Sequence, residues 1–215
     1  MPHQPRIHAP DLYYHVYARG NNKEPIFFED ADYHRFLNNL ENYREDLHYK
    51  LFGYCLLPNH FHLLLQVKST PLSNIMQILM TAYTMYINKK YQRVGHVFQG
   101  RYQSIVIEKE TYLLQVHRYI HLNPVKSGLA RLPEEYLWSS YSQYFKETID
   151  KPQIETNEML ELFSNNPDNQ KMLFREFTLS GVDNEFDPLK EHVRGILGGP
   201  KLVRKLTKML RGAHP

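Results

Sequence analysis

The sequence predicts an α+β fold in which a β-sheet carries helices on one face. Segments rich in β-formers alternate with segments of helical periodicity, in the order strand, helix, strand, strand, helix, strand, helix. The chain has 215 residues, of which 42% are hydrophobic. That is enough apolar material for one core with a small addition to it.

Three strands and one helix are predicted in the first part of the chain. Residues 11–20 are rich in β-formers and end in glycine before the turn sequence GNNKEP, which predicts a strand. Residues 29–50 place apolar side chains at helical spacing. The apolar segments 50–58 and 59–68 are expected to form two strands, with a bend between them.

A helix, a strand and a second helix follow. Residues 71–93 open with proline and serine and continue as a long segment with an apolar helical face. Residues 101–110 are expected to form a strand, and residues 111–123 a helix. Pro124 is expected to end that helix, because proline lacks the backbone N–H that would continue it.

The character of the chain changes after residue 145, so residues 1–145 are expected to form one domain. Residues 146–157 are polar and are interpreted as a linker. Residues 146–215 as a whole are predicted to be this linker followed by a small, basic, helical C-terminal region. Its glycine pair at 198–199 is expected to lie in a turn between two short helices.

Composition limits the class of protein. No run of eighteen apolar residues is present, so no membrane span is expected. The first residues lack the apolar centre of a signal peptide, and the single cysteine, Cys55, has no partner for an internal disulfide. A cytoplasmic protein is therefore expected. The net charge of +3 and the pI of about 8.8 favour polyanionic partners only mildly.

Two histidines flank one phenylalanine in the apolar stretch LLPNHFHLLLQV, which spans residues 56–67. Because side chains alternate along a strand, His60 and His62 should share one face, about 7 Å apart at Cα. Two imidazoles so placed can converge on one metal ion. The alternative is a pair of hydrogen-bonded or surface histidines on a half-exposed strand.

A second candidate group lies on the predicted helix 111–123. Tyr119 and Asn123 are four residues apart and continue a stripe formed by Tyr112 and Val116. A buried asparagine needs a polar partner, because an unpaired amide is costly to bury. That partner is either a metal ion or the backbone at the end of the helix.

Five linked stretches resemble one known family, the REP-associated tyrosine transposases, which are single-tyrosine HUH transposases. They are YYHVYARGNN, GYCLLPNHFHLLLQ, GHVFQGRYQS, HRYIHLNPVKSGL and WSSY, in the family's order, and they cover roughly residues 10 to 145. The resemblance implies a ferredoxin-like antiparallel sheet with helices on one face. The last seventy residues contribute little to it.

The resemblance also implies chemistry, namely DNA transposition by cutting and rejoining single-stranded DNA through a 5′-phosphotyrosine link. The matching nucleophile is Tyr119, with Tyr112 as a weaker candidate. His60, His62 and Asn123 match the family's metal ligands and suit Mg²⁺ or Mn²⁺, although Zn²⁺ also accepts imidazoles. A freed 3′-OH could later attack the link, so ATP is not required.

The expected partner is single-stranded DNA beside a REP-like hairpin, in a bacterial, nucleoid-associated setting. The protein could act as a monomer or a homodimer. A charged side chain taken singly is more often an ordinary surface residue than a DNA contact, and Tyr102 is a candidate for stacking on a base. The candidate DNA contacts are Arg19, Arg101, Tyr102, Arg118, Lys126, Lys201, Arg204 and Lys205.

Two other functions are compatible with the same residues. One is a catalytically weak regulator that binds DNA or RNA in a sequence-specific way on the same fold. The other is a metal-dependent hydrolase with water as the nucleophile, which would form no covalent protein–DNA species.

Overall fold

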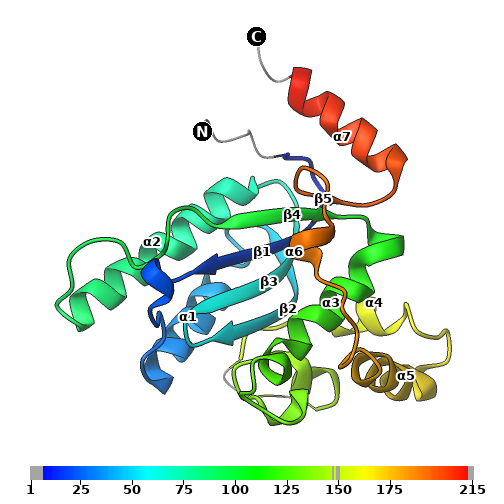
Figure 1. Ribbon diagram of the computed structural model, residues 1–215, viewed down its shortest axis with the longest axis horizontal. Coiled ribbons are helices and arrows are strands. Elements are labelled where there is room, and N and C mark those ends of the chain that lie inside the picture. The colour runs from blue at the N-terminus through cyan, green and yellow to red at the C-terminus, as the bar shows by residue number, and fades with distance from the viewer. Residues whose placement is uncertain (1–6, 147, 149–150, 213–215) are drawn as a thin grey trace.

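The core of the protein is a five-stranded sheet in the order β2-β3-β1-β4-β5 (Figure 1). The computed structural model describes residues 7–146, 148 and 151–212. The first four strands pair antiparallel, and β5 joins the edge parallel to β4. The strands are β1 (Tyr13–Arg19), β2 (Tyr49–Leu57), β3 (His60–Val67), β4 (Gln103–Ile107) and β5 (Ile196–Leu197). The predicted α+β class and ferredoxin-like sheet are confirmed, with β5 as an addition.

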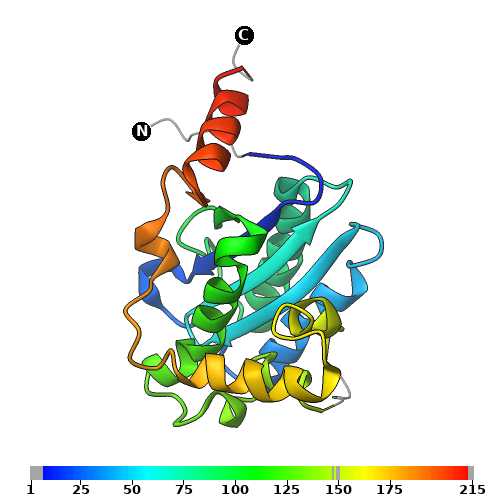
Figure 2. The same cartoon turned by 90° about the vertical axis from the view of Figure 1, so that its right-hand side faces the viewer.

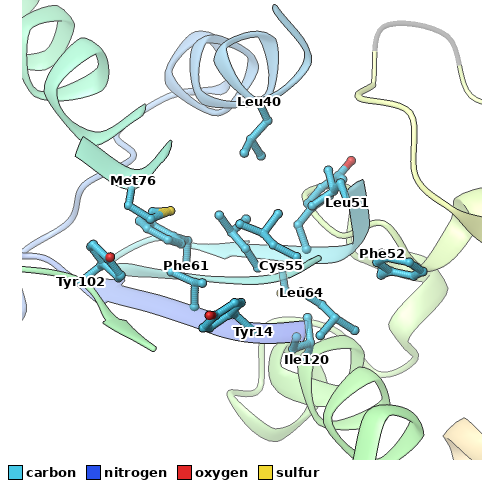
Figure 3. Packing of buried hydrophobic residues seen from close by; sticks show 14 of the residues in the cluster. Tyr14, Leu40, Leu51, Phe52, Cys55, Phe61, Leu64, Met76, Tyr102 and Ile120 are labelled. Atoms are coloured by element: carbon cyan, nitrogen blue, oxygen red, sulfur yellow. The ribbon is translucent and has the colours of Figure 1, made fainter. Parts of the chain in front are cut away.

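Helices cover both faces of the sheet, so the expectation of helices on one face alone needs correction. Figure 3 shows Leu40 of α1 (Asp30–Asn42) and Met76 of α2 (Leu72–Lys90) on one side of the strands. Ile120 of α3 (Lys109–Lys126) lies on the other side. The reason is that β2 and β3 are buried along almost their whole length, so both of their faces need an apolar cover.

The boundaries of two helices differ from the prediction. Helix α1 ends at Asn42, and residues 43–48 form turns instead of extending the helix to residue 50. Helix α3 continues through Pro124 to Lys126. Pro124 lacks one N–H and so removes a single helical hydrogen bond, and α3 ends two residues later. The chain then turns at Gly128, which has a φ of 69°.

The C-terminal part returns to the sheet domain. It contains α4 (Thr156–Leu160), α5 (Pro167–Leu179), α6 (Pro188–Glu191) and α7 (Pro200–Gly212). Phe174 of α5 is buried, and its ring centroid lies 4.6 Å from that of Tyr144. Helix α7 projects away from the sheet in both views (Figures 1 and 2). Strand β5 directly precedes the glycine pair, so the expected turn between two helices joins a strand to α7 instead.

The outer edge of β2 is also paired. The N–H of Leu56 donates to Trp138 O at 2.9 Å, and the N–H of Ser140 donates to Tyr54 O at 3.0 Å. This short segment lies in the stretch WSSY and protects an otherwise open sheet edge. Part of the predicted linker, at residues 147, 149 and 150, lies outside the described residues. Among the described residues, no helix is long and apolar enough to span a membrane.

A buried carboxylate ties α1 to the end of α2. Asp32 is 0% exposed. Its oxygens accept hydrogen bonds of 2.5 to 3.2 Å from the N–H groups of Phe28 and Glu29, the hydroxyls of Tyr86 and Tyr91, and Lys90 Nζ. Burial alone would raise the pKa of Asp32, but these bonds, led by that from Lys90, hold it below its ordinary value.

We predict that Asp32→Ala lowers the free energy of unfolding by about 3 kcal/mol at pH 7, because it leaves buried donors unpaired. A depressed carboxyl pKa contributes stability above the ordinary value of 3.8, and this is lost as the pH falls through the folded value. The effect of the substitution should therefore shrink in acid. Urea denaturation at several pH values measures it.

Glu24→Ala is the matched control, because Glu24 is half exposed and pairs with Arg93 at the surface. We expect that variant to change stability by about 0.5 kcal/mol or less. Equal effects of the two substitutions at pH 7 would contradict the assigned role of Asp32.

Candidate active site

A cavity of about 520 Å³ opens on the sheet face that carries α3. None of the described residues that line it is acidic, so the cavity suits an anionic ligand. The lining comes from β1, β3, the start of β4 and the loop before it, α3 with the residue after it, and α6. It consists of Tyr17, Ala18, Arg19, His60, His62, Gln99, Gly100, Arg101, Gln103, Tyr119, Asn123, Ser127 and Leu189.

The register of the strands brings His60 and His62 together. On β3 the two rings share a face, with centroids 5.2 Å apart. Each imidazole already uses its Nδ1: His60 Nδ1 lies 2.6 Å from Asn59 Oδ1, and His62 Nδ1 lies 2.8 Å from His15 Nε2. Neither contact uses the Nε2 atom of His60 or of His62.

Both imidazoles are held in the neutral form. Burial lowers the pKa of His60 to about 4, and the positive charge of Arg19 adds to this, while a hydrogen-bonding interaction with Asn123 opposes it. Burial, together with the neighbouring His15 and His60, lowers the pKa of His62 well below its ordinary value. Metal ions bind neutral imidazole, so these histidines are in the binding form at pH 7.

Tyr119 faces this pair from α3. Its ring centroid lies 5.7 Å from that of His62, and the two rings meet edge to face. Burial and the negative charge of Asp187 raise the pKa of Tyr119 to about 12, while Asn123 and Arg19 oppose this. The phenol therefore carries its proton at neutral pH.

Asn123 lies one helical turn after Tyr119 and also lines the cavity. Its Nδ2 donates to Tyr119 O at 3.1 Å, which uses the amide's donor side within its own helix. The amide oxygen Oδ1 remains as a hard oxygen donor of the kind that Mg²⁺ and Mn²⁺ accept. The amide of Asn123 therefore bonds to the helix backbone through Nδ2, and its Oδ1 could still bind a metal ion.

The donor set fits a divalent ion. Two neutral imidazoles, each bonded through Nδ1, and one side-chain amide line the same cavity. Within the described part of the chain, no group of three or more His, Cys, Asp or Glu side chains is placed to hold a metal. A metal ion here would therefore need Asn123 and ligands from substrate or solvent in addition to the two histidines.

The candidate DNA contacts separate into three groups. Arg19 and Arg101 are exposed and line the cavity. Lys126 is exposed near the end of α3, where its Nζ donates to Asn184 O at 2.6 Å. The basic residues of α7 are exposed on the helix that projects from the body, and they are Lys201, Arg204 and Lys205. All six remain predictions.

Two of the predicted contacts are wrong because their side chains are buried. Tyr102 is 4% exposed and packs in the core, so it does not offer its ring to a base (Figure 3). Arg118 is 7% exposed. Its guanidinium lies 4.4 Å from the ring centroid of Phe177 and donates to Gln115 Oε1 at 2.6 Å. Arg118 therefore joins α3 to α5.

Sequence reasoning missed His15 and Tyr17. Both lie on β1, where they share the face of His62, and Tyr17 is directly opposite His62 in the strand pairing. Alternation in YYHVY indicates that the two residues share a face, but it does not identify their neighbours on another strand. Tyr112, the weaker nucleophile candidate, is half-buried against the core and does not line the cavity.

Comparisons with known proteins agree with this geometry. A family model described as "Transposase IS200 like" matches residues 8–123. A Haemophilus influenzae protein named as a REP-associated tyrosine transposase is 29% identical over 107 residues, which cover 44% of this chain. The matched region spans only 60% of that relative's length.

A solved structure shares the fold. It is a REP-associated tyrosine transposase bound to a REP hairpin, and it matches with a TM-score of 0.58 at 12% identity. The match covers 73% of this chain and 93% of the other. At this identity the likeness supports the shared architecture.

A second buried polar cluster fixes α3 against β2. The imidazoles of His117 and His121 lie 4.2 Å apart between centroids, on the side of α3 away from the cavity. His117 Nε2 contacts Tyr144 Oη at 2.8 Å, and that hydroxyl donates to Phe52 O at 2.6 Å. His121 Nε2 contacts Ser140 Oγ at 2.8 Å. These bonds hold α3, and hence Tyr119, in one rotation about the helix axis.

We predict that Tyr144→Phe lowers the free energy of unfolding by about 2 kcal/mol, because it leaves the buried Phe52 carbonyl and the buried His117 imidazole without this hydrogen-bond partner. Thermal or urea denaturation measures this. Tyr43→Phe, at a half-buried position after α1, should change stability by less than about 0.5 kcal/mol. Equal stability of the Tyr144→Phe variant and the unmodified protein would show that this cluster does not anchor α3.

Proposed function

This chain belongs to the IS200-like family of transposases, and we propose that it is a single-tyrosine HUH enzyme that cuts and rejoins single-stranded DNA. The observation that carries the proposal is the position of Tyr119. Its ring centroid lies 5.7 Å from that of His62, and both side chains line a cavity to which Arg19 and Arg101 also contribute and whose described lining residues include no acidic one. A tyrosine nucleophile, neutral imidazoles and cationic side chains are the groups that such a cut requires.

The chemical step exchanges one phosphate ester for another. Tyr119 Oη forms a bond to phosphorus while the bond from phosphorus to O3′ breaks, and the phenol proton is lost as O3′ gains one. The products are a 5′-phosphotyrosine link and a free 3′-OH. Attack of a 3′-OH on that link reverses the exchange and joins a strand, so no nucleotide cofactor is consumed.

The residues around Tyr119 have separate tasks. His60, His62 and Asn123 would hold a divalent ion, Mg²⁺ or Mn²⁺, which when bound offsets the negative charge of the phosphate. Arg19 lowers the pKa of Tyr119, whereas Asp187 raises it. We propose that Arg19 also contacts the phosphate.

We propose that the substrate is single-stranded DNA beside a hairpin. The solved relative with the same fold is described as bound to a REP hairpin, and the exposed cations at the cavity suit a phosphate backbone. Binding through such cations should weaken as salt increases.

We predict that Tyr119→Phe reduces cutting of a pool of hairpin-bearing oligonucleotides at least about 1,000-fold while leaving their binding intact. Gel analysis of cut strands and a separate binding titration measure the two effects. Tyr112→Phe is the matched control and should still cut, and a chelator should stop cutting by the unmodified protein.

Other outcomes would each contradict a different part of the proposal. Continued cutting by Tyr119→Phe would favour a hydrolase with water as the nucleophile. Loss of cutting in Tyr112→Phe alone would transfer the nucleophile to Tyr112. Tight binding of a cognate hairpin with no cutting by the unmodified protein would indicate a DNA-binding regulator.

A further inference from the structure

His15 is a fully buried histidine that contacts one candidate metal ligand, His62, from the neighbouring strand. It lies in the middle of β1 with 0% exposure, and β1 pairs antiparallel with β3. Its ring stacks on that of His62, with centroids 5.0 Å apart and planes inclined by 25°. His15 Nε2 lies 2.8 Å from His62 Nδ1.

Packing alone does not explain an imidazole at this position. The side chain is surrounded by other rings, with centroids of Tyr17 at 5.5 Å and Tyr119 at 5.8 Å. Its Nδ1 is buried and finds no hydrogen-bond partner among the described residues. An apolar ring would fill the same space without burying an unpaired nitrogen. We therefore look to the hydrogen bond between His15 Nε2 and His62 Nδ1 for the reason that this position is a histidine.

That bond determines which nitrogen of His62 is free. A hydrogen bond between two neutral imidazoles holds one hydrogen, which belongs to either ring. If His62 Nδ1–H donates to His15 Nε2, then His62 Nε2 carries a lone pair and can bind a metal. If His15 Nε2–H donates instead, His62 Nε2 carries the hydrogen and cannot bind one.

We propose that His15 is a positioning residue that accepts the Nδ1–H of His62 and so presents His62 Nε2 to a divalent ion. The inference rests on the proposed function, because it assumes that His62 is a metal ligand. Partners of this kind orient a ligating histidine, and their loss commonly weakens metal affinity by about 10- to 100-fold. Asn59 Oδ1 stands in the equivalent place for His60.

Two substitutions of His15 separate the hydrogen bond from the packing. His15→Phe keeps a ring but removes the hydrogen-bond acceptor. His15→Gln removes the ring but places an amide oxygen, which can also accept, near the position of Nε2. We predict that His15→Phe weakens Mn²⁺ binding about 10- to 100-fold and that His15→Gln largely restores it. Calorimetric titration of the DNA-free protein with Mn²⁺ measures this, and the rise in melting temperature on adding Mn²⁺ provides a second readout.

Val16→Ala controls for loss of packing, because Val16 is a fully buried neighbour on the opposite face of β1. It should lower the melting temperature without changing Mn²⁺ affinity. Equal Mn²⁺ affinity in His15→Phe and the unmodified protein would overturn the inference. Failure of the unmodified protein to bind any divalent ion would instead overturn the metal site of the proposed function, and the inference with it.

Nitrogen-15 NMR of the unmodified protein tests the same point without any substitution. With diamagnetic Mg²⁺ or Zn²⁺ bound, His62 should carry its hydrogen on Nδ1, and His15 should also carry its hydrogen on Nδ1. A hydrogen on His62 Nε2 in the metal-bound protein would overturn the inference even if His15→Phe failed to fold.

Discussion

The antiparallel register between β1 and β3 is the constraint on which the candidate site depends. It places Tyr17 opposite His62 and Arg19 opposite His60, so that four polar side chains share one face with His15. A slip of one residue would turn every side chain of one strand to the other face. The register is enforced from that other face, where Ala18 pairs with Phe61 in the apolar core under α1 and α2.

Helix α3 packs on this face and adds Tyr119 and Asn123 to the candidate site. The same helix presents Tyr119 to the histidines and His117 with His121 to the buried cluster below β2. Gly53 of β2 lies against this cluster, where a Cβ would be in ordinary van der Waals contact with both imidazoles. The stretch HRYIHLNP thus contains both the proposed nucleophile and two histidines that anchor the helix. A nucleophile on a rigidly packed helix needs little reorganisation to reach a phosphate held by the sheet.

Local sequence patterns predict much of this arrangement. Alternation identifies the shared face of His60 and His62, and helical spacing identifies that of Tyr119 and Asn123. Three features depend instead on elements that are distant in the chain. They are the position of α3 on the sheet face opposite α1 and α2, the contact of His15 with His62, and the burial of Arg118 against Phe177. Periodicity and propensity carry no information about such contacts. The sequence alone therefore does not show that Arg118 packs against α5 or that Tyr102 packs in the core.

The residue to which DNA becomes attached shows whether Tyr119 is the nucleophile. The protein would be incubated with hairpin-bearing single-stranded DNA and Mn²⁺, denatured, and digested with trypsin and nuclease. Because trypsin cleaves after Arg118, Tyr112 and Tyr119 fall in different peptides. We expect a nucleotide on Tyr119, in the peptide 119–126, that is absent when a chelator is added. Attachment to Tyr112, or cut strands with no attached nucleotide, would contradict it.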